Sequence, residues 1–581
     1  MTPHVDPPDF SLNRLFLQSD SPRPRLRVGI LADAAGVPRF ARQVIDDIRA
    51  CNFAEIVCVV VNRNDNDAAS RAAEFRRGLA YSAYRRWISR PPPAPFDPVE
   101  IVNHGLPAGQ VRSLEVTPIA RDNAQHLPPD AVAAVRALDL DVLLQFGFGR
   151  LGGGVLAAAK SGVWSYRHAD TSAYRGGPPM LWELIEGNPT SGVELQRLGD
   201  GPDDSLPLIK ARFTTADTTS AAVNGYGPYW CTTHFVIQKL HELHRLGWAH
   251  LENVAPANKP YGGKRGQYRD PTNADMAQWL VPHVARVTLR RLNTLLRRLS
   301  GRTTTIHWRL GLRRSDRAMY EDYAPATALR SFRWIDSPRG HFWADPYLHE
   351  ADGKVLLFFE DFDYTSRLGS IAVADLADDG TVHDPRIVLQ RPYHLSYPQV
   401  FRHAGETWMV PESSESGAIE LWRARGFPDD WVLEQRLIEI RAVDPTVVQH
   451  DGRWWLFATP MAVLGHFAQT YLWSADQLTG PWRLHEGGVV CSDVSRARPA
   501  GRIFVSGNRL VRPSQDCSGR YGRAIWFNEI ERLDQAAYVE RPVVRISSSG
   551  TPGLIGLHTY SRGGGWEAVD GLFRCPMKAV R

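Results

Sequence analysis

The sequence has few cysteines and no long apolar run. Six cysteines are scattered over 581 residues without a Cys-x-x-Cys pair, so neither a disulfide framework nor a metal centre is expected. No stretch approaches the ~18 consecutive apolar residues of a membrane-spanning helix. The N-terminus lacks a basic segment followed by an apolar one, so the expected location is cytoplasmic, with peripheral membrane association left open.

The sequence has only a small excess of positive charge. The 68 basic and 63 acidic residues leave a net charge of +5, too little to indicate nucleic acid as a partner, and none is expected. No Gly-x-Gly-x-x-Gly fingerprint of a dinucleotide site is present. The apolar content of 43% is that of a folded protein, and the length predicts two or three domains.

We expect an N-terminal extension (1–24), an α/β domain (25–250), a basic helical connector (251–330) and an all-β domain (331–581). In the α/β domain, predicted strands at 25–32, 55–61, 141–148, 162–166, 193–198 and 208–213 alternate with predicted helices at 39–50, 128–138 and 232–246. This order predicts a Rossmann-like, mostly parallel sheet with ligands at the carboxyl ends of its strands.

The connector contains a predicted helix at 274–299 with apolar residues at helical spacing. Ten arginines lie between Arg286 and Arg317, and Asp316 is the only acid there. One interpretation is a bridging helix with a solvated basic face. A second is an interfacial helix that contacts anionic lipid, and nucleic acid is the remaining alternative.

The second half repeats a strand, a tight turn and a strand. Ala344-Asp-Pro…Asp352-Gly corresponds to Val443-Asp-Pro…Asp451-Gly, and weaker copies start near residues 397, 501 and 557. The spacing of about 50 residues is the length of a four-stranded propeller blade. Five copies predict a five-bladed β-propeller rather than a β-sandwich. The whole chain has 18 tryptophans, and those of the second half are expected to pack between the blades.

The segment 162–204 carries three motifs of the α/β domain. Tyr174-Arg175-Gly176, Ser191-Gly192-Val193 and Gly201-Pro202-Asp203 follow one another, and Phe146–Gly149 precedes them. This order resembles the N-formyltransferase fold of the methionyl-tRNA and glycinamide ribonucleotide formyltransferases over residues 25–215. The resemblance implies 10-formyltetrahydrofolate as cofactor, and substrate contacts at Tyr174, Arg175 and Gly176.

In that family an amine attacks the formyl carbon, Asn and His stabilise the oxyanion, and an Asp assists proton transfer. Here Ser165 stands at the Asn position, Arg167 at the His position and Asp203 at the Asp position, while His168 is one residue late. Three alternatives remain. The domain is an acyl transferase with altered residues, a different enzyme using His168, Asp170 and Asp203, or a non-catalytic binding domain.

In the propeller, residues at the starts of the repeats are expected to converge on the central channel. The candidate binding residues of the propeller are Asp345, Glu412, Asp444, Arg502, Asp516 and His558. The fold resembles arabinanase- and xylosidase-type glycoside hydrolases, which implies Asp345 as base, Glu412 as acid and Asp444 as modulator of the acid.

A string of motifs in order, from FWADPYL through HLSYPQVF, VPESSE and AVDPT to QDCSGRYGRA, resembles the N-terminal domain of plant glucosamine inositolphosphorylceramide transferases over residues 331–575. The leading hypothesis is transfer of a formyl or related one-carbon group to an amino sugar of a glycan or glycolipid held by the propeller. Ser165 and Arg167 would stabilise the oxyanion, and His168 and Asp203 would move protons. The alternatives are glycoside hydrolysis or glycosyl transfer in the propeller, and a glycan-binding scaffold without catalysis.

Overall fold

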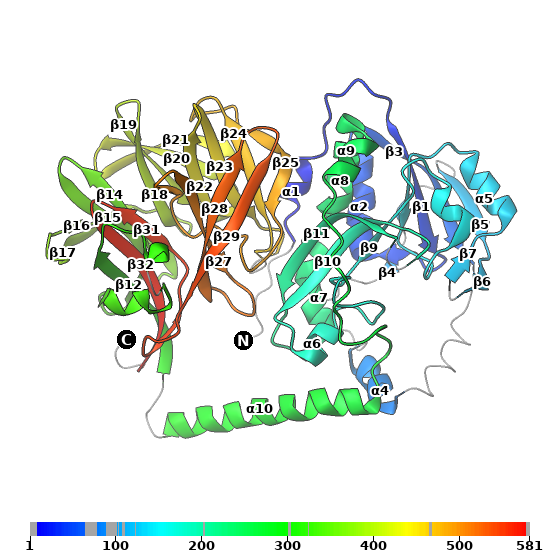
Figure 1. Ribbon diagram of the computed structural model, residues 1–581, viewed down its shortest axis with the longest axis horizontal. Coiled ribbons are helices and arrows are strands. Elements are labelled where there is room, and N and C mark those ends of the chain that lie inside the picture. Colours follow the sequence, from blue (N-terminus) through cyan, green and yellow to red (C-terminus); the bar gives the residue numbers. More distant parts are fainter. Residues whose placement is uncertain are drawn as a thin grey trace. The chain divides into compact units, whose positions relative to one another are not determined.

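The structure is a computed structural model that describes residues 8–63, 78–88, 101–102, 104–106, 111–122, 124–201, 204–299, 304–322, 325–463 and 467–576. The chain divides into two compact units, Met1–Ala285 with Ala462–His466, and Arg286–Met461 with Phe467–Arg581 (Figure 1). The division falls within helix α10 (Asn273–Leu299). None of the helices described has both the length and the hydropathy needed to cross a bilayer.

The first unit contains a seven-stranded sheet in the order β11-β10-β9-β8-β1-β3-β5. Neighbouring strands are parallel from β9 to β5, whereas β10 is antiparallel to both β9 and β11. The strands are β1 (Leu26–Asp33), β3 (Ala54–Asn62), β5 (Arg112–Val116), β8 (Val142–Gln145), β9 (Val163–Arg167), β10 (Thr190–Arg197) and β11 (Leu206–Thr214). The predicted Rossmann-like sheet is confirmed.

The other elements of this unit are α1 (Ser11–Arg14), β2 (Val37–Pro38), α2 (Arg39–Ala50), α4 (Leu79–Ile88), β4 (Ile101–Val102), β6 (Ile119–Arg121), β7 (Ala124–His126), α5 (Pro129–Arg136), η1 (Gly153–Ala157), α6 (Trp182–Glu186), α7 (Ala221–Trp230), α8 (His234–Leu246) and α9 (Trp248–Asn253). The predicted helix at 39–50 coincides with α2, because apolar residues every three or four positions form one buried face. The predicted strand at 141–148 ends at Gln145, because the backbone at Gly147 lies directly against the end of β1. A Cβ there would lie 2.2 Å from the backbone nitrogen of Asp33.

The second unit is a five-bladed β-propeller. Four blades are four-stranded antiparallel sheets. The first contains β14 (His341–Ala351), β15 (Lys354–Asp363), β16 (Leu368–Leu376) and β17 (Val382–Leu389), and the second contains β18 (Ser396–His403), β19 (Glu406–Glu412), β20 (Ile419–Gly426) and β21 (Asp430–Ile438). The third contains β22 (Ala442–His450), β23 (Arg453–Pro460), β24 (Thr470–Ala475) and β25 (Arg483–Cys491), and the fourth contains β26 (Phe504–Ser506), β27 (Arg509–Asp516), β28 (Ala524–Leu533) and β29 (Tyr538–Ser547).

The fifth blade joins the two ends of the second unit. It contains β12 (Thr304–Arg314), β13 (Arg333–Ile335), β30 (Leu554–Gly556), β31 (Tyr560–Gly563) and β32 (Trp566–Pro576), and the short helices η2 (Met319–Glu321) and η3 (Pro325–Ser331) follow β12; η4 (Ser414–Ser416) lies in the second blade. Strand β12, which comes from the segment expected to be a connector, pairs with β32 along all 11 of its residues. This pairing closes the ring of blades.

The turns predicted from the repeats are present in the first and third blades. Asp352 and Gly353 have φ of 52° and 74°, and Asp451 and Gly452 have φ of 48° and 75°. Positive φ at both central residues defines the type I′ hairpin turn, which Asp-Gly adopts readily.

Aromatic side chains pack between the blades, as expected from the tryptophan content. Trp422 and Trp431 share a buried cluster with Phe358 of the neighbouring blade, and Trp343 and Trp566 join the fifth blade to the first.

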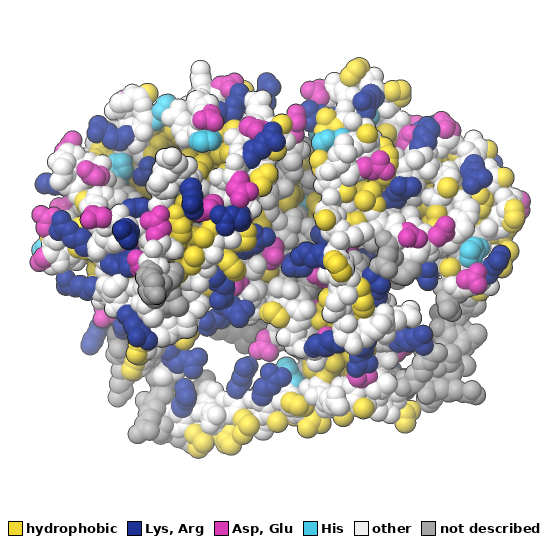
Figure 2. Space-filling model, in the orientation of Figure 1, with side chains coloured by type: hydrophobic (Ala, Val, Ile, Leu, Met, Phe, Trp, Pro, Cys, Tyr) yellow, Lys and Arg dark blue, Asp and Glu magenta, His cyan; other side chains and the backbone are white. Residues whose placement is uncertain are grey.

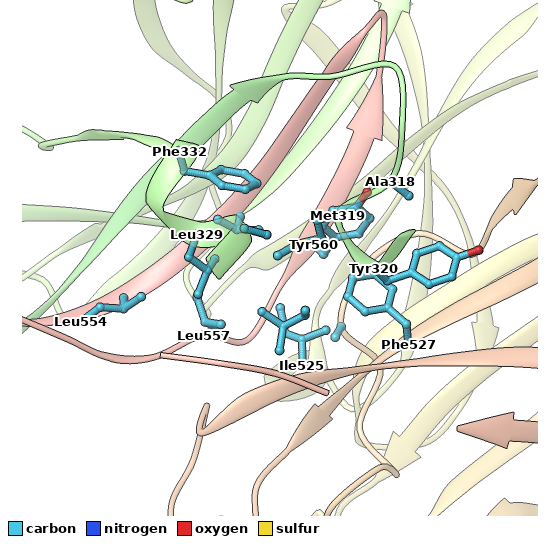
Figure 3. Packing of buried hydrophobic residues seen from close by; sticks show 14 of the residues in the cluster. Ala318, Met319, Tyr320, Leu329, Phe332, Ile525, Phe527, Leu554, Leu557 and Tyr560 are labelled. Carbon is cyan, nitrogen blue, oxygen red and sulfur yellow. The ribbon is translucent and has the colours of Figure 1, made fainter. Parts of the chain in front are cut away.

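The fourth and fifth blades meet in a further buried cluster (Figure 3). Ile525 and Phe527 of β28 lie beside Leu557 and Tyr560 there, and Met319 of η2 closes the cluster. Burial of these apolar surfaces, rather than hydrogen bonding between sheets, holds adjacent blades together.

Candidate functional site

The carboxyl ends of three parallel strands of the first unit are joined by Asp33. Its Oδ1 accepts hydrogen bonds from the backbone N–H of Phe148 (2.8 Å) and from Nδ2 of Asn62 (3.2 Å). Strands β1 and β3 and the loop after β8 therefore end at one place, which is where open α/β sheets bind ligands.

Strand β9 supplies candidate side chains to one face of the sheet. Ser165 pairs with Gln145 of β8 and with Gln196 of β10, so three polar side chains form a row on that face. Arg167 stands two residues further along, opposite Glu194 of β10. Because side chains alternate along a strand, Ser165 and Arg167 point to the same face.

His168 lies with the opposite face, in an aromatic cage. Its ring stacks on Tyr229 with centroids 3.6 Å apart, lies 5.7 Å from Tyr166 and meets Phe40 edge-on at 5.2 Å. Burial, with the charge of Arg167 acting in the same direction, lowers the pKa of His168 to about 3. The imidazole is therefore neutral at pH 7. Within the described part of the chain, its Nε2 has no hydrogen-bond partner.

The loop after β10 is held by residues of the loop after β8. The backbone oxygen of Asp200 accepts a hydrogen bond from Nη2 of Arg150 (2.9 Å), and the charge of Arg150 acts on Arg167. Asp203, the predicted proton carrier in this loop, lies outside the described residues. Arg150 thus links the described part of this loop to the surroundings of Arg167.

Asp170 anchors the segment after β9 to β11. Its Oδ2 accepts hydrogen bonds from Nε (3.2 Å) and Nη2 (2.9 Å) of Arg212, and its Oδ1 accepts one from Oγ of Ser172 (2.5 Å). Burial alone would raise the pKa of Asp170, but the hydrogen bonds from Ser172 and the charge of Arg212 hold it below its usual range. Asp170 is an ionised, fully engaged carboxylate.

The Tyr174-Arg175-Gly176 motif contacts the segment 261–268 rather than an open cleft. The guanidinium of Arg175 lies 4.1 Å from the ring centroid of Tyr261, and the rings of Tyr174 and Tyr268 are 5.0 Å apart. Gly176 has φ of 106°, and a Cβ there would lie 2.1 Å from the carbonyl oxygen of Tyr268. The motif therefore holds part of the expected connector against the first unit, and its substrate role stays a prediction.

In the propeller, the inner strands of three blades carry the same backbone irregularity. Asp345, Tyr397 and Asp444 each stand at a shift in pairing register and have left-handed backbones, with φ of 52°, 51° and 49°. In the fourth blade Gly501, before β26, has a positive φ of 120°, which differs from the φ of these three residues, and Arg502 has no positive φ. The N–H of Gly501 donates to Oη of Tyr397 (2.5 Å).

Asp345 belongs to a buried group with His558 and Asp570. Nδ1 of His558 lies 2.5 Å from Oδ2 of Asp570, and Nε2 lies 3.6 Å from Oδ1 of Asp345. Although burial lowers it, the pKa of His558 is raised above its usual value by the charges of Asp570 and Asp345. Thr559 donates to Asp345 (2.5 Å), and Trp308 stacks on His558 at 4.0 Å. One potential ligand atom from each of the two aspartates and the histidine lies within 4.8 Å of the others, so this group has the geometry to hold a cation.

Arg498 pairs with the other two carboxylates of the channel. Its Nε hydrogen-bonds to Oδ2 of Asp444, its Nη2 lies 3.0 Å from Oδ1 of Asp444, and Nη2 lies 3.6 Å from Oε2 of Glu412. Gln515 also donates to Asp444 (2.7 Å), and the Tyr521 ring centroid lies 4.8 Å from the guanidinium. Asp444 is thus the best neutralised of the three acids.

Two of the buried carboxyl groups, Asp345 and Glu412, hold protons more tightly than exposed ones. Burial raises the pKa of Asp345 to about 6, with opposing contributions from His558 and Asp570. Burial, reinforced by the charge of Asp444, raises the pKa of Glu412 well above its usual range. The pKa values of Asp345 and Glu412 are therefore shifted in the same direction, with burial as the main cause for both.

Two further predicted binding residues have other surroundings. Asp516 accepts hydrogen bonds from Nε of Arg545 (2.8 Å) and from the backbone N–H of Ser518 (2.9 Å), which ties the last three strands of the fourth blade together at their ends. Arg502 is exposed, and its charge acts on Tyr347, further along β14 than Asp345.

Asp570, Thr559 and Gln515 are site residues that the sequence motifs do not single out, although Gln515 lies within one of the motifs. Asp570 lies in β32, the second strand of the fifth repeat, whereas the repeats were compared by their first strands. An acid followed by glycine in that last strand, Asp570-Gly571, was the available signal.

The fold and the two sites define a protein with a formyltransferase-like α/β unit and a five-bladed propeller. Residues 328–551 match the family model described as glucosamine inositolphosphorylceramide transferase 1, N-terminal. Glucosamine inositolphosphorylceramide transferase 1 of Oryza sativa subsp. japonica is 36% identical over 250 residues, which are 41% of this chain and 34% of that protein. The chain thus spans about a third of the length of this relative.

The methionyl-tRNA formyltransferase of Caulobacter vibrioides is 32% identical over 95 residues, 16% of this chain and 31% of that protein. Among solved structures, the RS223 β-xylosidase aligns with a TM-score of 0.31 at 11% identity, over 40% of this chain and 92% of that chain. The propeller assignment follows from the strand pairing and not from this likeness. The resemblances of the first unit to formyltransferases and of the second to the plant N-terminal domain are confirmed.

Proposed function

We propose that this protein transfers a formyl or related one-carbon acyl group to the amino group of an amino sugar in a glycan or glycolipid. One observation carries the proposal: a single chain joins a formyltransferase-like unit to a propeller whose relatives are named glucosamine inositolphosphorylceramide transferase 1. Glucosamine offers the amine that formyl transfer requires. In this proposal the propeller holds the glycan.

The donor set on one face of the first unit fits a formyl group. When an amine attacks, the formyl oxygen gains negative charge and needs hydrogen-bond donors. The Ser165 hydroxyl and the Arg167 guanidinium supply two donors on the same face of the sheet. The formyl donor proposed is 10-formyltetrahydrofolate, which supplies an electrophilic carbon when bound.

The transfer also needs a proton acceptor. The new carbon–nitrogen bond forms as the bond between the formyl carbon and the donor nitrogen breaks, and the amine proton passes through a base to that nitrogen. His168 has a pKa of about 3 and packs with the other face of the sheet, so it is a weak base in the wrong place. We assign proton transfer to Asp203 and leave His168 as a packing residue of its aromatic cage.

The test is turnover of the full chain with 10-formyltetrahydrofolate and glucosamine-bearing glycolipids, with N-acetylated acceptors as controls that lack the amine. Mass spectrometry detects the formylated amine. Ser165→Ala and Arg167→Ala should each lower kcat by ~100-fold or more, as loss of an oxyanion donor does, whereas His168→Phe should retain most activity. The reverse ranking would overturn the residue assignment. No turnover of any amine, together with no folate binding by calorimetry, would overturn the function.

A second candidate is glycosyl chemistry in the propeller, favoured by one observation. Two buried carboxyl groups, Asp345 and Glu412, lie at the inner strands of neighbouring blades, and burial raises the pKa of Glu412 well above its usual range, the direction that a general acid requires. This candidate predicts that Asp345→Asn and Glu412→Gln abolish hydrolysis or glycosyl transfer while Arg167→Ala leaves it intact. Glycan binding without turnover of any glycan or amine would instead indicate a scaffold.

A further inference from the structure

Helix α10 has two apolar faces, and the first unit uses only one of them. Near its N-terminus, Met276 and Trp279 are buried in a cluster with Tyr84 of α4 and Leu181. The rings of Tyr84 and Trp279 lie 5.7 Å apart. This contact fixes which side of the helix faces the first unit.

The other apolar face is exposed. Six aliphatic side chains on it keep between 50% and 66% of their surface in solvent: Val281, Val284, Leu289, Leu292, Leu295 and Leu296. At 100° per residue these six fall within an arc of about 140°, away from the arc that contains Met276 and Trp279. The stripe runs for roughly 24 Å at 1.5 Å per residue. Figure 2 shows its yellow side chains along the lower edge of the molecule.

The remaining surface of the helix is basic. Five arginines occur between Arg286 and Arg298, and the only acid of α10 is Asp275, in the first turn. By helical geometry Arg286, Arg290 and Arg297 lie on the side opposite the stripe. In Figure 2 the dark blue side chains lie beside the yellow edge of this helix.

This combination fits a bilayer surface better than other partners. A long aliphatic stripe gives nucleic acid nothing to bind, since phosphates and bases contact charged, polar and aromatic groups. A bilayer interface takes up the aliphatic stripe, and its anionic headgroups attract the arginines on the rest of the helix, of which Arg291 borders the stripe by helical geometry. The helix does not have the hydropathy to cross the bilayer, so it would lie in the plane of the interface.

We propose that α10 is an interfacial helix that binds the protein to a membrane surface rich in anionic lipid. The stripe from Val281 to Leu296 enters the acyl boundary, and the arginines contact the headgroups. The inference does not depend on the proposed enzymatic function.

The test is flotation of the full chain with phosphatidylcholine vesicles with and without phosphatidylglycerol, an anionic lipid. We expect binding only to the anionic vesicles, and weaker binding at high salt. The triple variant Leu289→Ser, Leu292→Ser and Leu296→Ser should bind at least about tenfold more weakly. A matched variant, Ile387→Ser with Val505→Ser and Val539→Ser, removes equally exposed aliphatic groups from the propeller and should bind like the wild type.

A labelling experiment fixes the orientation of the helix. All six native cysteines are buried, so an environment-sensitive fluorophore attached to Leu292→Cys reports from the stripe and one attached to Thr294→Cys from the opposite side. Anionic vesicles should shift the emission of the first probe and not of the second. Equal binding of the stripe variant and the wild type, equal response of both probes, or loss of a dimer instead of lipid binding in the stripe variant would overturn the proposal.

Discussion

The two units hold their candidate side chains in different ways. In the propeller, three blades repeat the same bulge with a left-handed residue, so Asp345, Tyr397 and Asp444 occupy equivalent places by symmetry. In the α/β unit a single strand carries Arg167, and His168 follows it directly. A difference of one residue there moves a side chain to the opposite face of the sheet. Positions taken from a repeat are therefore robust to small alignment errors, whereas positions on a single strand are not.

The forces also differ. Charge pairs hold the channel carboxylates, as Arg498 does for Asp444, while ring packing holds His168 against Tyr229. The stability of the propeller should therefore fall most when a buried charge of the channel is removed. The stability of the α/β unit should depend on pH and on the shape of the side chain at His168. Four predictions, from the largest expected effect to the smallest, test this contrast.

Removing the buried cation of the channel should cost most. Arg498→Met leaves Asp444 and Glu412 buried without their cation, so the free energy of unfolding in urea should fall by about 3–5 kcal/mol. The control Arg423→Met breaks a half-exposed pair with Glu434 and should cost at most about 1 kcal/mol. Equal losses in the two variants would contradict a channel held by charge.

The carboxyl group of Asp345 should make the propeller less stable as pH rises. Its folded pKa of about 6 lies above the ordinary value of 3.8, so the stabilisation by its proton is present below pH 3.8 and is lost as pH rises through 6. Asp345→Asn does not titrate. Between pH 4 and 6 it should gain about 2 kcal/mol of stability relative to the wild type, measured by urea unfolding at each pH. Parallel pH curves for the two proteins would refute this.

His168 should give the α/β unit the opposite response. Its folded pKa of about 3 lies below the ordinary 6.5, so its contribution to stability is present above pH 6.5 and is lost as pH falls toward 3. Between pH 6.5 and 5 the wild type should lose about 2 kcal/mol relative to His168→Phe. Hydrogen exchange of the β9 amides at both pH values measures the change locally. If the stability difference between the wild type and His168→Phe is the same at pH 6.5 and at pH 5, the imidazole is not enclosed.

Loss of one hydroxyl in the Tyr174 motif should have the smallest effect. The Oη of Tyr174 accepts a hydrogen bond from Nδ2 of Asn188 (3.1 Å), and the ring stays packed in Tyr174→Phe. The free energy of unfolding should fall by about 1 kcal/mol. A large loss of turnover without this small loss of stability would instead support the predicted substrate role of Tyr174.

Much of the fold could be predicted from local patterns. The helix at 39–50, the Asp-Gly turns and the five repeats follow from apolar spacing and turn chemistry, which depend on neighbours in the chain. The partners of the candidate residues could not be predicted. His558 and Asp570 meet through the local β31–β32 hairpin, but Asp345 of the first blade reaches them only because the ring of blades closes, and no local signal encodes that closure.

The sequence by itself determined the two architectures, the equivalent positions of Asp345 and Asp444, and the amphipathic character of α10, because periodicity is a local property. Only the tertiary structure decided that His168 packs away from Arg167 and that the stripe of α10 stays exposed. It also decided that Glu412 shares Arg498 with Asp444. Faces, exposure and charge pairs depend on which distant segments pack together, and that is settled by burial across the whole chain.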